Sequence, residues 1–431
     1  MRLNTKQRSL MALGLVALLL ASCSPLSTRA ADVAQSKLER VASPDVSAAD
    51  LEELVEGNNA FAWDLYQAWR EENGNLFYSP YSISVALAMT YAGARGETEQ
   101  QMRETLSFLL PNESLHPAFN SLDQQLSNLA ESGRDHEEEP FELKIANSIW
   151  GQSGYEWLPE FLDLLAENYG AGLRLADFID DPEAARQAIN RWVSDQTKDR
   201  IEDLIAEGLI DPSTRLVLAN AIYFKAAWQH PFEESRTEDV PFYLADGGET
   251  TVPMMSMATT GHLLYAAGDG YQAVQLPYEG GRVAMSIIVP DAGGFRQFEA
   301  GLTANRVEAI LDGLESQSVA LRLPKFEYES SYQMSRTLAE MGMPAAFRAG
   351  ADLSGMDGTR DLFISEVAHK AFVAVDEAGT EAAAATAVMV ALSAMPTTPV
   401  ELTIDRPFVF VIRDIATGST LFVGRVLDPT S

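Results

Sequence analysis

Hydrophobic positions recur along this chain with two different periods. In some segments apolar side chains return every three or four residues, which is typical of helices that pack one face on a core, and in others they alternate or run continuously, which is typical of strands. This pattern predicts helices over 51–70, 80–92, 97–109, 114–131, 159–169, 182–201, 295–314 and 332–341. It predicts strands over 75–78, 141–150, 173–178, 215–228, 251–257, 262–267, 272–278, 283–290, 318–328, 364–375, 406–412 and 420–426. The mixture indicates an α+β fold.

An alanine-rich stretch from Glu377 to Pro396 fits neither class simply. It reads Glu-Ala-Gly-Thr-Glu-Ala-Ala-Ala-Ala-Thr-Ala-Val-Met-Val-Ala-Leu-Ser-Ala-Met-Pro, and its alanine content favours a helix. Its even positions from Thr380 to Leu392 are all uncharged, and most are small or β-branched, whereas the odd positions carry the one charge, Glu381. That period of two suits a strand with one buried face. Side chains this small would let the stretch be exposed in one state and enter between existing strands in another.

The N-terminus has the pattern of an export signal. Three basic residues precede an apolar run from Leu10 to Leu20, which is too short to span a membrane as a mature helix. The run ends in Leu-Ala-Ser-Cys, which resembles a bacterial lipobox, and Cys23 is the only cysteine, so it has no disulfide partner in the chain. We predict a lipoprotein signal peptide over 1–22 and lipidation of Cys23. Residues 23–50, rich in Ser, Ala and charge, are expected to be a flexible tether.

Composition and net charge limit the domain size and the classes of partner that this protein can have. Hydrophobic residues make up 46% of 431, enough for a sizeable core in one large domain or two to three smaller ones. The formal net charge of −31 becomes −34 once residues 1–22, with three basic residues and no acid, are removed. Such a charge disfavours nucleic acid and anionic lipid surfaces. We expect an exported protein, lipid-anchored to the cell envelope on its periplasmic or outer side, or extracellular, that meets the membrane only through its lipid.

Enzyme signatures are missing from the sequence. It contains no His-Glu-x-x-His, no Gly-x-Ser-x-Gly and no phosphate-binding loop. The five histidines have no metal-ligand spacing: His116, His136, His230, His262 and His369. We therefore expect no catalytic residues, no metal and no cofactor.

Several blocks together carry a family resemblance. They are 75–98 with its Gly-Ala-Arg-Gly-Glu-Thr ending, 215–232, 364–386 with the alanine-rich hinge, and the closing hairpin over 406–426. In this order they resemble the serpin family over about 51–429. The resemblance implies a serpin domain over 51–431 with three β-sheets, about nine helices and an exposed reactive-centre loop near the C-terminus.

The resemblance also implies a mechanism. A protease would cleave the exposed loop and form an acyl-enzyme, and the freed hinge would insert into the central sheet and distort the trapped enzyme. The matching hinge residues are Glu377, Gly379, Thr380, Ala382, Ala383, Ala384, Ala385 and Thr386. Counting fourteen residues from Gly379, the spacing in inhibitory members, gives Ser393 before the cleaved bond and Ala394 after it. The bonds Leu392–Ser393 and Ala394–Met395 remain alternatives.

The residues around this bond indicate the class of target. A small residue suits elastase-like enzymes, whereas Leu392 would suit a chymotrypsin-like or cathepsin-like enzyme. No Arg or Lys lies between Lys370 and Arg406, so trypsin-like targets are disfavoured. The expected partner is a serine protease, with a cysteine protease as the weaker alternative. In serpins that use glycosaminoglycan cofactors the matching helix is often basic, whereas the helix over 114–131 has almost no basic residues, so the resemblance implies no glycosaminoglycan activation. We also expect a monomer.

Two polar groups match structural roles of the family. Ser79, Ser82, Asn220 and His369 match the cluster under the point where the central sheet parts, which we call the latch. Lys325 and Glu377 match an ion pair near Trp228 at the top of the sheet, which we call the breach. Two alternatives stay open: a non-inhibitory serpin that binds a ligand or partner, and a hydrolase on a similar scaffold that uses Ser79 or Ser82 with His369.

Overall fold

The computed structural model describes residues 32–132, 142–257, 261–380 and 398–431. In these ranges the helices are α1 (Ala48–Trp69), α2 (Pro80–Tyr91), α3 (Gly96–Thr105), α4 (Asn112–Ser132), α5 (Pro159–Tyr169), α6 (Pro182–Gln196), α7 (Phe295–Ala300), α8 (Ala304–Asp312), α9 (Ser335–Met341) and α10 (Ser354–Asp357), with 3-10 turns η2 (Glu234–Arg236) and η3 (Pro344–Phe347). The strands are β1 (Val33–Ala34), β2 (Leu76–Tyr78), β3 (Glu142–Gln152), β4 (Leu173–Ala176), β5 (Leu216–Ala227), β6 (Glu238–Tyr243), β7 (Glu249–Ser256), β8 (Gly261–Gly268), β9 (Tyr271–Pro277), β10 (Val283–Pro290), β11 (Glu315–Pro324), β12 (Phe326–Gln333), β13 (Ile364–Val375), β14 (Gly379–Thr380), β15 (Val400–Thr403), β16 (Phe408–Asp414) and β17 (Thr420–Val426).

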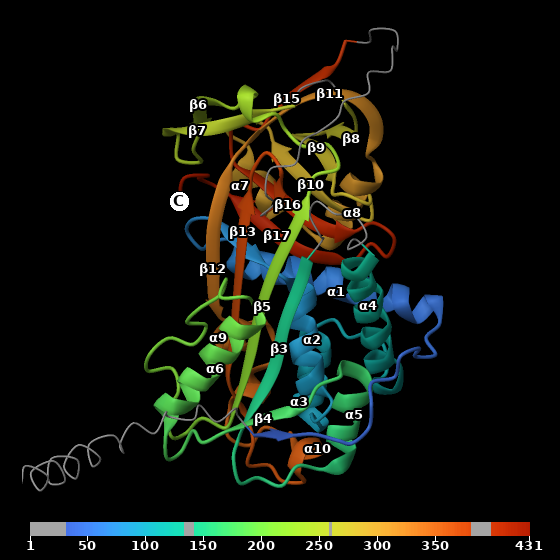
Figure 1. Ribbon diagram of the computed structural model, residues 1–431, viewed down its shortest axis with the longest axis vertical. Coiled ribbons are helices and arrows are strands. Elements are labelled where there is room, and N and C mark those ends of the chain that lie inside the picture. Colours follow the sequence, from blue (N-terminus) through green and yellow to red (C-terminus); the bar gives the residue numbers. More distant parts are fainter. Residues whose placement is uncertain (1–31, 133–141, 258–260, 381–397) are drawn as a thin grey trace, which may run out of the picture.

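A seven-stranded sheet runs along the long axis of the molecule (Figure 1). Its order is β1-β4-β3-β5-β14-β13-β12. β5 is antiparallel to β3 and parallel to β13. Residues 216–224 of β5 are all buried, as the continuous apolar run predicts for a strand covered on both faces.

Helices cover both faces of this sheet. α6 lies on one face, where Ile189 and Val193 pack with Trp150 and Val217 of the strands. α2 lies behind β3 and β5 in Figure 1 and is buried along its whole length. A strand that entered the sheet would therefore lie between two apolar layers.

A second sheet of ten strands forms the upper part of the molecule (Figure 1). Its order is β2-β17-β16-β10-β9-β8-β11-β7-β6, with β15 paired to β11. β11 joins two groups of strands, because Glu315 to Val319 pair with β8 and Arg322 to Pro324 pair with β7. Hydrogen bonds in the described ranges therefore link the smaller sheets of the expected three into one.

Several predicted elements differ from the observed ones, and three of the differences have a clear local reason. The helix expected over 295–314 is two helices, since α7 ends at Ala300, with Gly301 as its C-cap, and the Thr303 hydroxyl caps α8 by accepting from the Arg306 backbone N–H. The strand expected over 318–328 is also two, because β11 ends at Pro324 and Lys325 donates its N–H to Pro253 instead. The first helix begins three residues early, capped by Ser47.

Residues 32–50 are part of the fold, whereas the sequence predicted a flexible tether over 23–50. β1 pairs antiparallel with β4 and is itself the edge strand of the central sheet, covering the edge that β4 would otherwise expose. Arg40 forms a 2.8 Å ion pair with Asp123 of α4, and Val41 donates its N–H to the Glu167 carbonyl. The exposed backbone groups of an edge strand recruit such a segment without any hydrophobic period. The folded part therefore begins before residue 51.

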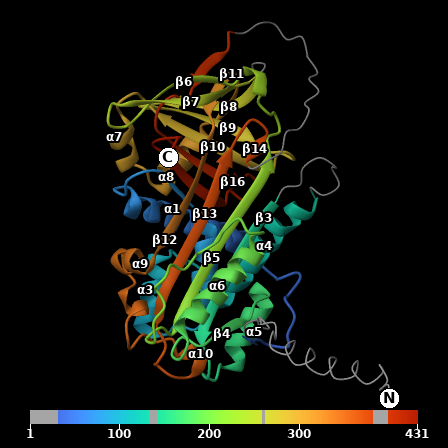
Figure 2. The same cartoon turned by 60° about the vertical axis from the view of Figure 1, so that its left-hand side comes forward.

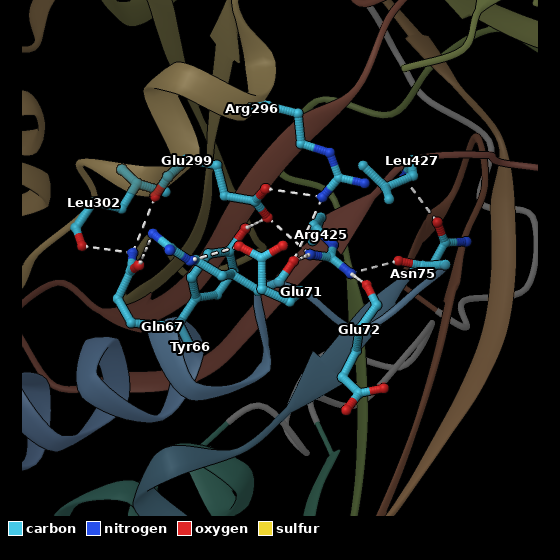
Figure 3. A network of polar contacts seen from close by, with 12 residues as sticks. Tyr66, Gln67, Glu71, Glu72, Asn75, Arg296, Glu299, Leu302, Arg425 and Leu427 are labelled. Carbon is cyan, nitrogen blue, oxygen red and sulfur yellow. Dashed lines mark hydrogen bonds and ion pairs between the residues drawn. The ribbon is translucent and has the colours of Figure 1, made fainter. Parts of the chain in front are cut away.

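A buried arginine joins the end of α1 to the closing hairpin (Figure 3). The Arg425 guanidinium, 0% exposed, donates to Glu299 Oε1 at 2.8 Å and to the carbonyls of Arg70, Glu72 and Gly74 at 2.7–2.8 Å. Glu299 also accepts from the Tyr66 hydroxyl at 2.9 Å. This network fixes β17 against α7 and the chain after α1.

The described ranges lack both a membrane-spanning helix and a metal-binding cluster. No helix there is both long and apolar enough to cross a bilayer. No group of three or more His, Cys, Asp or Glu side chains there has the geometry to hold a metal ion. The expected signal peptide and Cys23 lie outside the described residues.

Candidate functional site: the hinge and latch of the central sheet

The start of the hinge is a tight turn at the top of the central sheet. After β13 ends at Val375, the Asp376 N–H donates to the Gly379 carbonyl at 3.0 Å. The Asp376 carboxylate accepts from the backbone N–H groups of Ala378 and Gly379 at 2.9 and 3.1 Å. These bonds reverse the chain and direct β14 back along the sheet, next to the upper ends of β13 and β5 (Figure 2).

β14 already lies between β5 and β13. Gly379 stands opposite Ala227, and Thr380 stands opposite Ala226 on one side and Val375 on the other. A Cβ on Gly379 would lie 2.1 Å from the Ala226 carbonyl oxygen, so this close approach requires glycine. The Thr380 side chain is buried, and its hydroxyl shares a 2.7 Å hydrogen bond with the Tyr278 hydroxyl.

The breach residues hold this turn in place. Lys325 Nζ donates to Glu377 Oε2 at 2.7 Å, and the Thr237 hydroxyl donates to Oε1 at 2.6 Å. Burial acts to raise the pKa of Glu377, but these two hydrogen bonds lower it below its usual value. Trp228 stacks on Tyr278 with centroids 4.6 Å apart and donates its indole N–H to the Asp376 carbonyl. The structure thus brings the three breach residues together around the hinge.

The latch lies lower in the sheet, where β5 and β13 pair directly. Asn220 of β5 stands opposite His369 of β13, and the two side chains are hydrogen-bonded. The Asn220 amide donates to Ser82 Oγ at 2.7 Å, and the Ser79 N–H donates to His369 Nε2 at 3.2 Å. Since Nε2 accepts a backbone N–H, the proton lies on Nδ1, which donates to the Asn220 carbonyl oxygen. The structure therefore brings all four predicted latch residues together.

Asn147 is a fifth member that sequence reasoning missed. It stands opposite Asn220 on β3, and its carbonyl oxygen accepts from the Asn220 amide and from Ser82 Oγ, the latter at 3.1 Å. Its amide donates to the Ser82 carbonyl at 3.2 Å. The available signal was a polar residue between Ile145 and Ile149 on the inward face of a strand.

The geometry of the latch supports a structural role for its side chains and not a catalytic one. Ser79 Oγ accepts the Ser82 N–H and so serves as the N-cap of α2. His369 uses Nε2 to accept a backbone N–H, which leaves no ring nitrogen to activate a hydroxyl. Ser79, Ser82, Asn220 and His369 are all 0% exposed, so no substrate reaches them in this state.

The latch should weaken in acid. Burial lowers the pKa of His369 from 6.5 to about 3, so His369 is neutral in the native state while the unfolded state takes up a proton below pH 6.5. Stability from His369 is therefore complete above pH 6.5 and falls as pH decreases toward 3, by at most about 1.4 kcal/mol per pH unit. We expect the urea midpoint of the native protein to fall between pH 6.5 and 4.5. A smaller fall is expected for His369→Gln, and an equal fall would contradict the assignment.

A second buried histidine provides the matched control. Burial also lowers the pKa of His116 to about 4, but its partner is the Tyr169 hydroxyl, at 2.7 Å, and not the latch. His116→Gln should reduce the acid dependence of unfolding without changing the rate at which the central sheet opens. His369→Gln should change both.

Other predicted residues lie outside the described ranges. These are the hinge positions Ala382, Ala383, Ala384, Ala385 and Thr386, and the reactive-bond positions Leu392, Ser393, Ala394 and Met395. The described chain resumes at residue 398 and enters β15, which pairs parallel with β11. The two ends of the intervening segment therefore lie in different sheets.

Comparison with known proteins gives a consistent family. Residues 56–429 match the family described as Serpin (serine protease inhibitor). The leukocyte elastase inhibitor of Sus scrofa is 41% identical over 388 residues, covering 88% of this chain and 100% of that protein. The native structure of the thermophilic serpin tengpin matches with a TM-score of 0.80 at 28% identity, covering 92% and 100% of the two chains. Human thyroxine-binding globulin complexed with thyroxine matches with a TM-score of 0.77 at 30% identity, covering 89% and 100%.

Proposed function

The chain belongs to the serpin family of serine protease inhibitors, and we propose that it is a suicide-type inhibitor that traps its target as a covalent acyl-enzyme. The target cleaves the loop between β14 and β15 and becomes esterified to it. The freed hinge then enters the central sheet below β14 and carries the protease along. Distortion of the protease prevents hydrolysis of the ester.

The position of β14 carries this proposal. Its two residues already occupy the gap between β5 and β13 and pair with both strands. Below it, Leu216 to Ile222 of β5 pair directly with Ile364 to Ala371 of β13. A strand that continued β14 would separate these two segments. The latch pair Asn220 and His369 lies on this path and would have to part.

Strand direction supports a favourable insertion. β5 and β13 are parallel, whereas β14 is antiparallel to both. Extension of β14 would replace one parallel ladder by two antiparallel ladders, which have the better hydrogen-bond geometry per residue. It would also bury small side chains between the two apolar layers of the sheet. Both changes release free energy that the intact loop holds back.

We propose an elastase-like serine protease as the target. The support is the small residues at Ser393 and Ala394, together with the 41% identity to a protein named leukocyte elastase inhibitor. Cleavage after Leu392 by a chymotrypsin-like enzyme is the alternative target class, and a cysteine protease is a further one.

Incubation with three proteases tests the function. Protein lacking residues 1–23 is mixed with pancreatic elastase, chymotrypsin or trypsin and examined by denaturing gel and intact mass. We expect an SDS-stable complex with elastase, no complex with trypsin, and a C-terminal fragment whose mass places the cut after Ser393. Elastase with a blocked active-site serine is the control and should give no complex. Complete loop cleavage by elastase and chymotrypsin without any complex would contradict the proposal.

The alternative function is binding without inhibition. Human thyroxine-binding globulin, complexed with thyroxine, has a related fold at 30% identity. The small, uncharged residues at the even positions from Thr380 to Thr386 favour inhibition, because bulky or charged residues at the inserting positions would hinder insertion. A melting temperature that stays unchanged after loop cleavage would favour the binding protein, since insertion should raise it.

We also propose that the protein is exported and anchored by a lipid on Cys23. The basic start, the short apolar run and the Leu-Ala-Ser-Cys ending support this. The mass of protein isolated from cell envelopes tests it, because a mature chain should begin at a diacylated Cys23. An unmodified Cys23 would contradict the anchor and leave the inhibitory function untouched.

A further inference from the structure

The segment that leads into the fold carries an unusual share of exposed apolar side chains. In the described ranges seven large hydrophobic side chains are exposed, and three of them lie between residues 33 and 41. They are Val33, Leu38 and Val41, with exposed fractions of 39%, 48% and 41%. Single exposed apolar residues are ordinary on a protein surface, but three within nine residues form a local concentration. In a protein with a net charge of −31, such a concentration indicates a contact surface.

Hydrogen bonds hold this segment in place along α5. β1 pairs with β4 at one end of the segment. The Ser36 hydroxyl then donates to the Asp163 carboxylate of α5, and Val41 donates its N–H to the Glu167 carbonyl at 2.9 Å. The three exposed side chains therefore lie on the outer side of a fixed segment.

An apolar hollow lies beside this segment, at the start of α5. Its volume is about 340 Å³, and its walls include Leu38, Trp157, Pro159 and Leu162. Tryptophan is enriched where proteins meet the surface of a bilayer, because its ring is apolar and its N–H is polar. We call Val33, Leu38, Val41, Trp157, Pro159 and Leu162 together the N-terminal patch.

The charged residues around the N-terminal patch are mainly acidic. Glu39, Glu156 and Glu160 are exposed, and each adjoins a patch residue in the sequence. Lys37 is the one exposed basic residue between positions 33 and 41. An anionic headgroup would be repelled by this rim, whereas a zwitterionic lipid would not.

The proposed lipid anchor would bring the N-terminal patch to a bilayer. Eight residues, 24–31, separate Cys23 from Asp32, and a fully extended chain of that length spans at most ~30 Å. The central sheet is longer, since the twelve residues of β13 alone span ~40 Å. The face next to β1 therefore stays nearest the membrane. We propose that the N-terminal patch docks on a bilayer of zwitterionic lipid, as a second membrane contact beside the lipid on Cys23.

Docking in this way sets the direction of the reactive-centre loop, a consequence that rests on the proposed inhibitory function. β4 and α5 lie at one end of the molecule, and β15, which follows the loop in the chain, lies at the other end (Figure 1). The docked protein presents its loop away from the bilayer, to proteases that arrive from solution.

A single acyl chain attached to Cys23 tests the contact. Cys23 is the only cysteine, so a maleimide that carries a 14-carbon chain labels the mature chain, residues 23–431, at one place. One such chain binds membranes only marginally and reversibly, so a second contact is measurable as a higher partition coefficient. Leu38→Glu should lower partitioning into phosphatidylcholine vesicles about tenfold, because each methylene group that leaves water contributes about fourfold. Leu264→Glu is the control, at a leucine 38% exposed on β8, and should change partitioning less than about twofold.

Three outcomes would overturn the membrane contact. The first is equal partitioning of the wild type and Leu38→Glu. The second is tighter binding to vesicles that also contain phosphatidylglycerol, since the acidic rim predicts weaker binding there. The third is self-association of the wild type without vesicles that Leu38→Glu abolishes, which would assign the N-terminal patch to a second copy of this chain.

Hydrogen exchange locates the contact without any substitution. Phosphatidylcholine vesicles should protect the backbone amides of residues 33–41 and 157–162 in the labelled wild type and leave those of β15 unchanged. Protection of β15 in place of these residues would overturn the docking face.

Elastase tests the direction of the loop. Vesicle-bound protein should trap elastase at a rate within about twofold of the unbound protein. Loss of trapping on vesicles alone would overturn the outward direction and leave the contact standing. If neither form traps elastase, the proposed inhibitory function fails, while partitioning still decides the contact. Because the acyl chain is attached chemically, that result is independent of lipidation in the cell.

Discussion

Replacing Thr380 by arginine is expected to convert the protein from an inhibitor into a substrate of its target protease. The Thr380 side chain lies inside the sheet between Ala226 and Val375, and its hydroxyl bonds to that of Tyr278. A guanidinium there would be a buried charge without a partner, which costs about 3 kcal/mol or more. Since 1.4 kcal/mol corresponds to a factor of ten, complex formation should fall about 100-fold relative to simple cleavage. Densitometry of complex and cleaved product on denaturing gels measures this ratio.

Thr380→Val is the matched control for this prediction. Valine keeps the shape of threonine and removes only the hydrogen bond to Tyr278, so the residue still fits between β5 and β13. It should retain most of the inhibition, with a change of a few-fold at most. The rate of loop cleavage should be similar in both variants, because the cut lies far along the chain. Covalent complexes formed by Thr380→Arg as efficiently as by the wild type would show that insertion does not drive the trap.

Much of the site could be predicted, partly from local patterns in the sequence and partly from the family resemblance. Gly379, Thr380 and the alternation that follows them indicated a strand that enters a sheet, and the structure places the first two residues inside it. The four latch residues came from motifs that each occupy a different element, and they meet as the family resemblance implied. The alternation after Thr380 was informative because a period of two indicates which face of a strand is buried.

Other features depend on contacts that no local pattern encodes. Asn147 joins the latch because the register of β3 against β5 places it opposite Asn220. Residues 32–47 have no hydrophobic period, and their path is set by the open edge of β4. Arg425 is an arginine in an apolar strand, and its four acceptors come from parts of the chain more than 120 residues away. Tertiary partners determined each of these, so sequence periodicity could not.

The Arg425 network is expected to be the largest single polar contribution to native stability (Figure 3). Arg425→Met would leave Glu299, whose side chain is 3% exposed, as a buried carboxylate without its 2.8 Å partner. Breaking a buried pair in this way costs about 3–5 kcal/mol. Three backbone carbonyls after α1 would also lose their donor. We expect the free energy of unfolding, measured from the first urea transition, to fall by that amount. The midpoint of the transition should move to a lower urea concentration.

A double-mutant cycle separates the pair from general damage. Arg425→Met with Glu299→Gln removes the buried charge, which Arg296, 54% exposed and 3.3 Å from Glu299, compensates only in part. The double variant should therefore be more stable than Arg425→Met alone, and the two changes should be coupled by at least about 1 kcal/mol. The exposed pair Arg336–Glu340, 2.7 Å apart but 88% and 65% exposed, is the control. Arg336→Met should cost less than about 1 kcal/mol, because water solvates both partners after the change. Equal losses at the two sites would mean that burial of Arg425 does not set its contribution, and the closing hairpin would then be held by apolar packing alone.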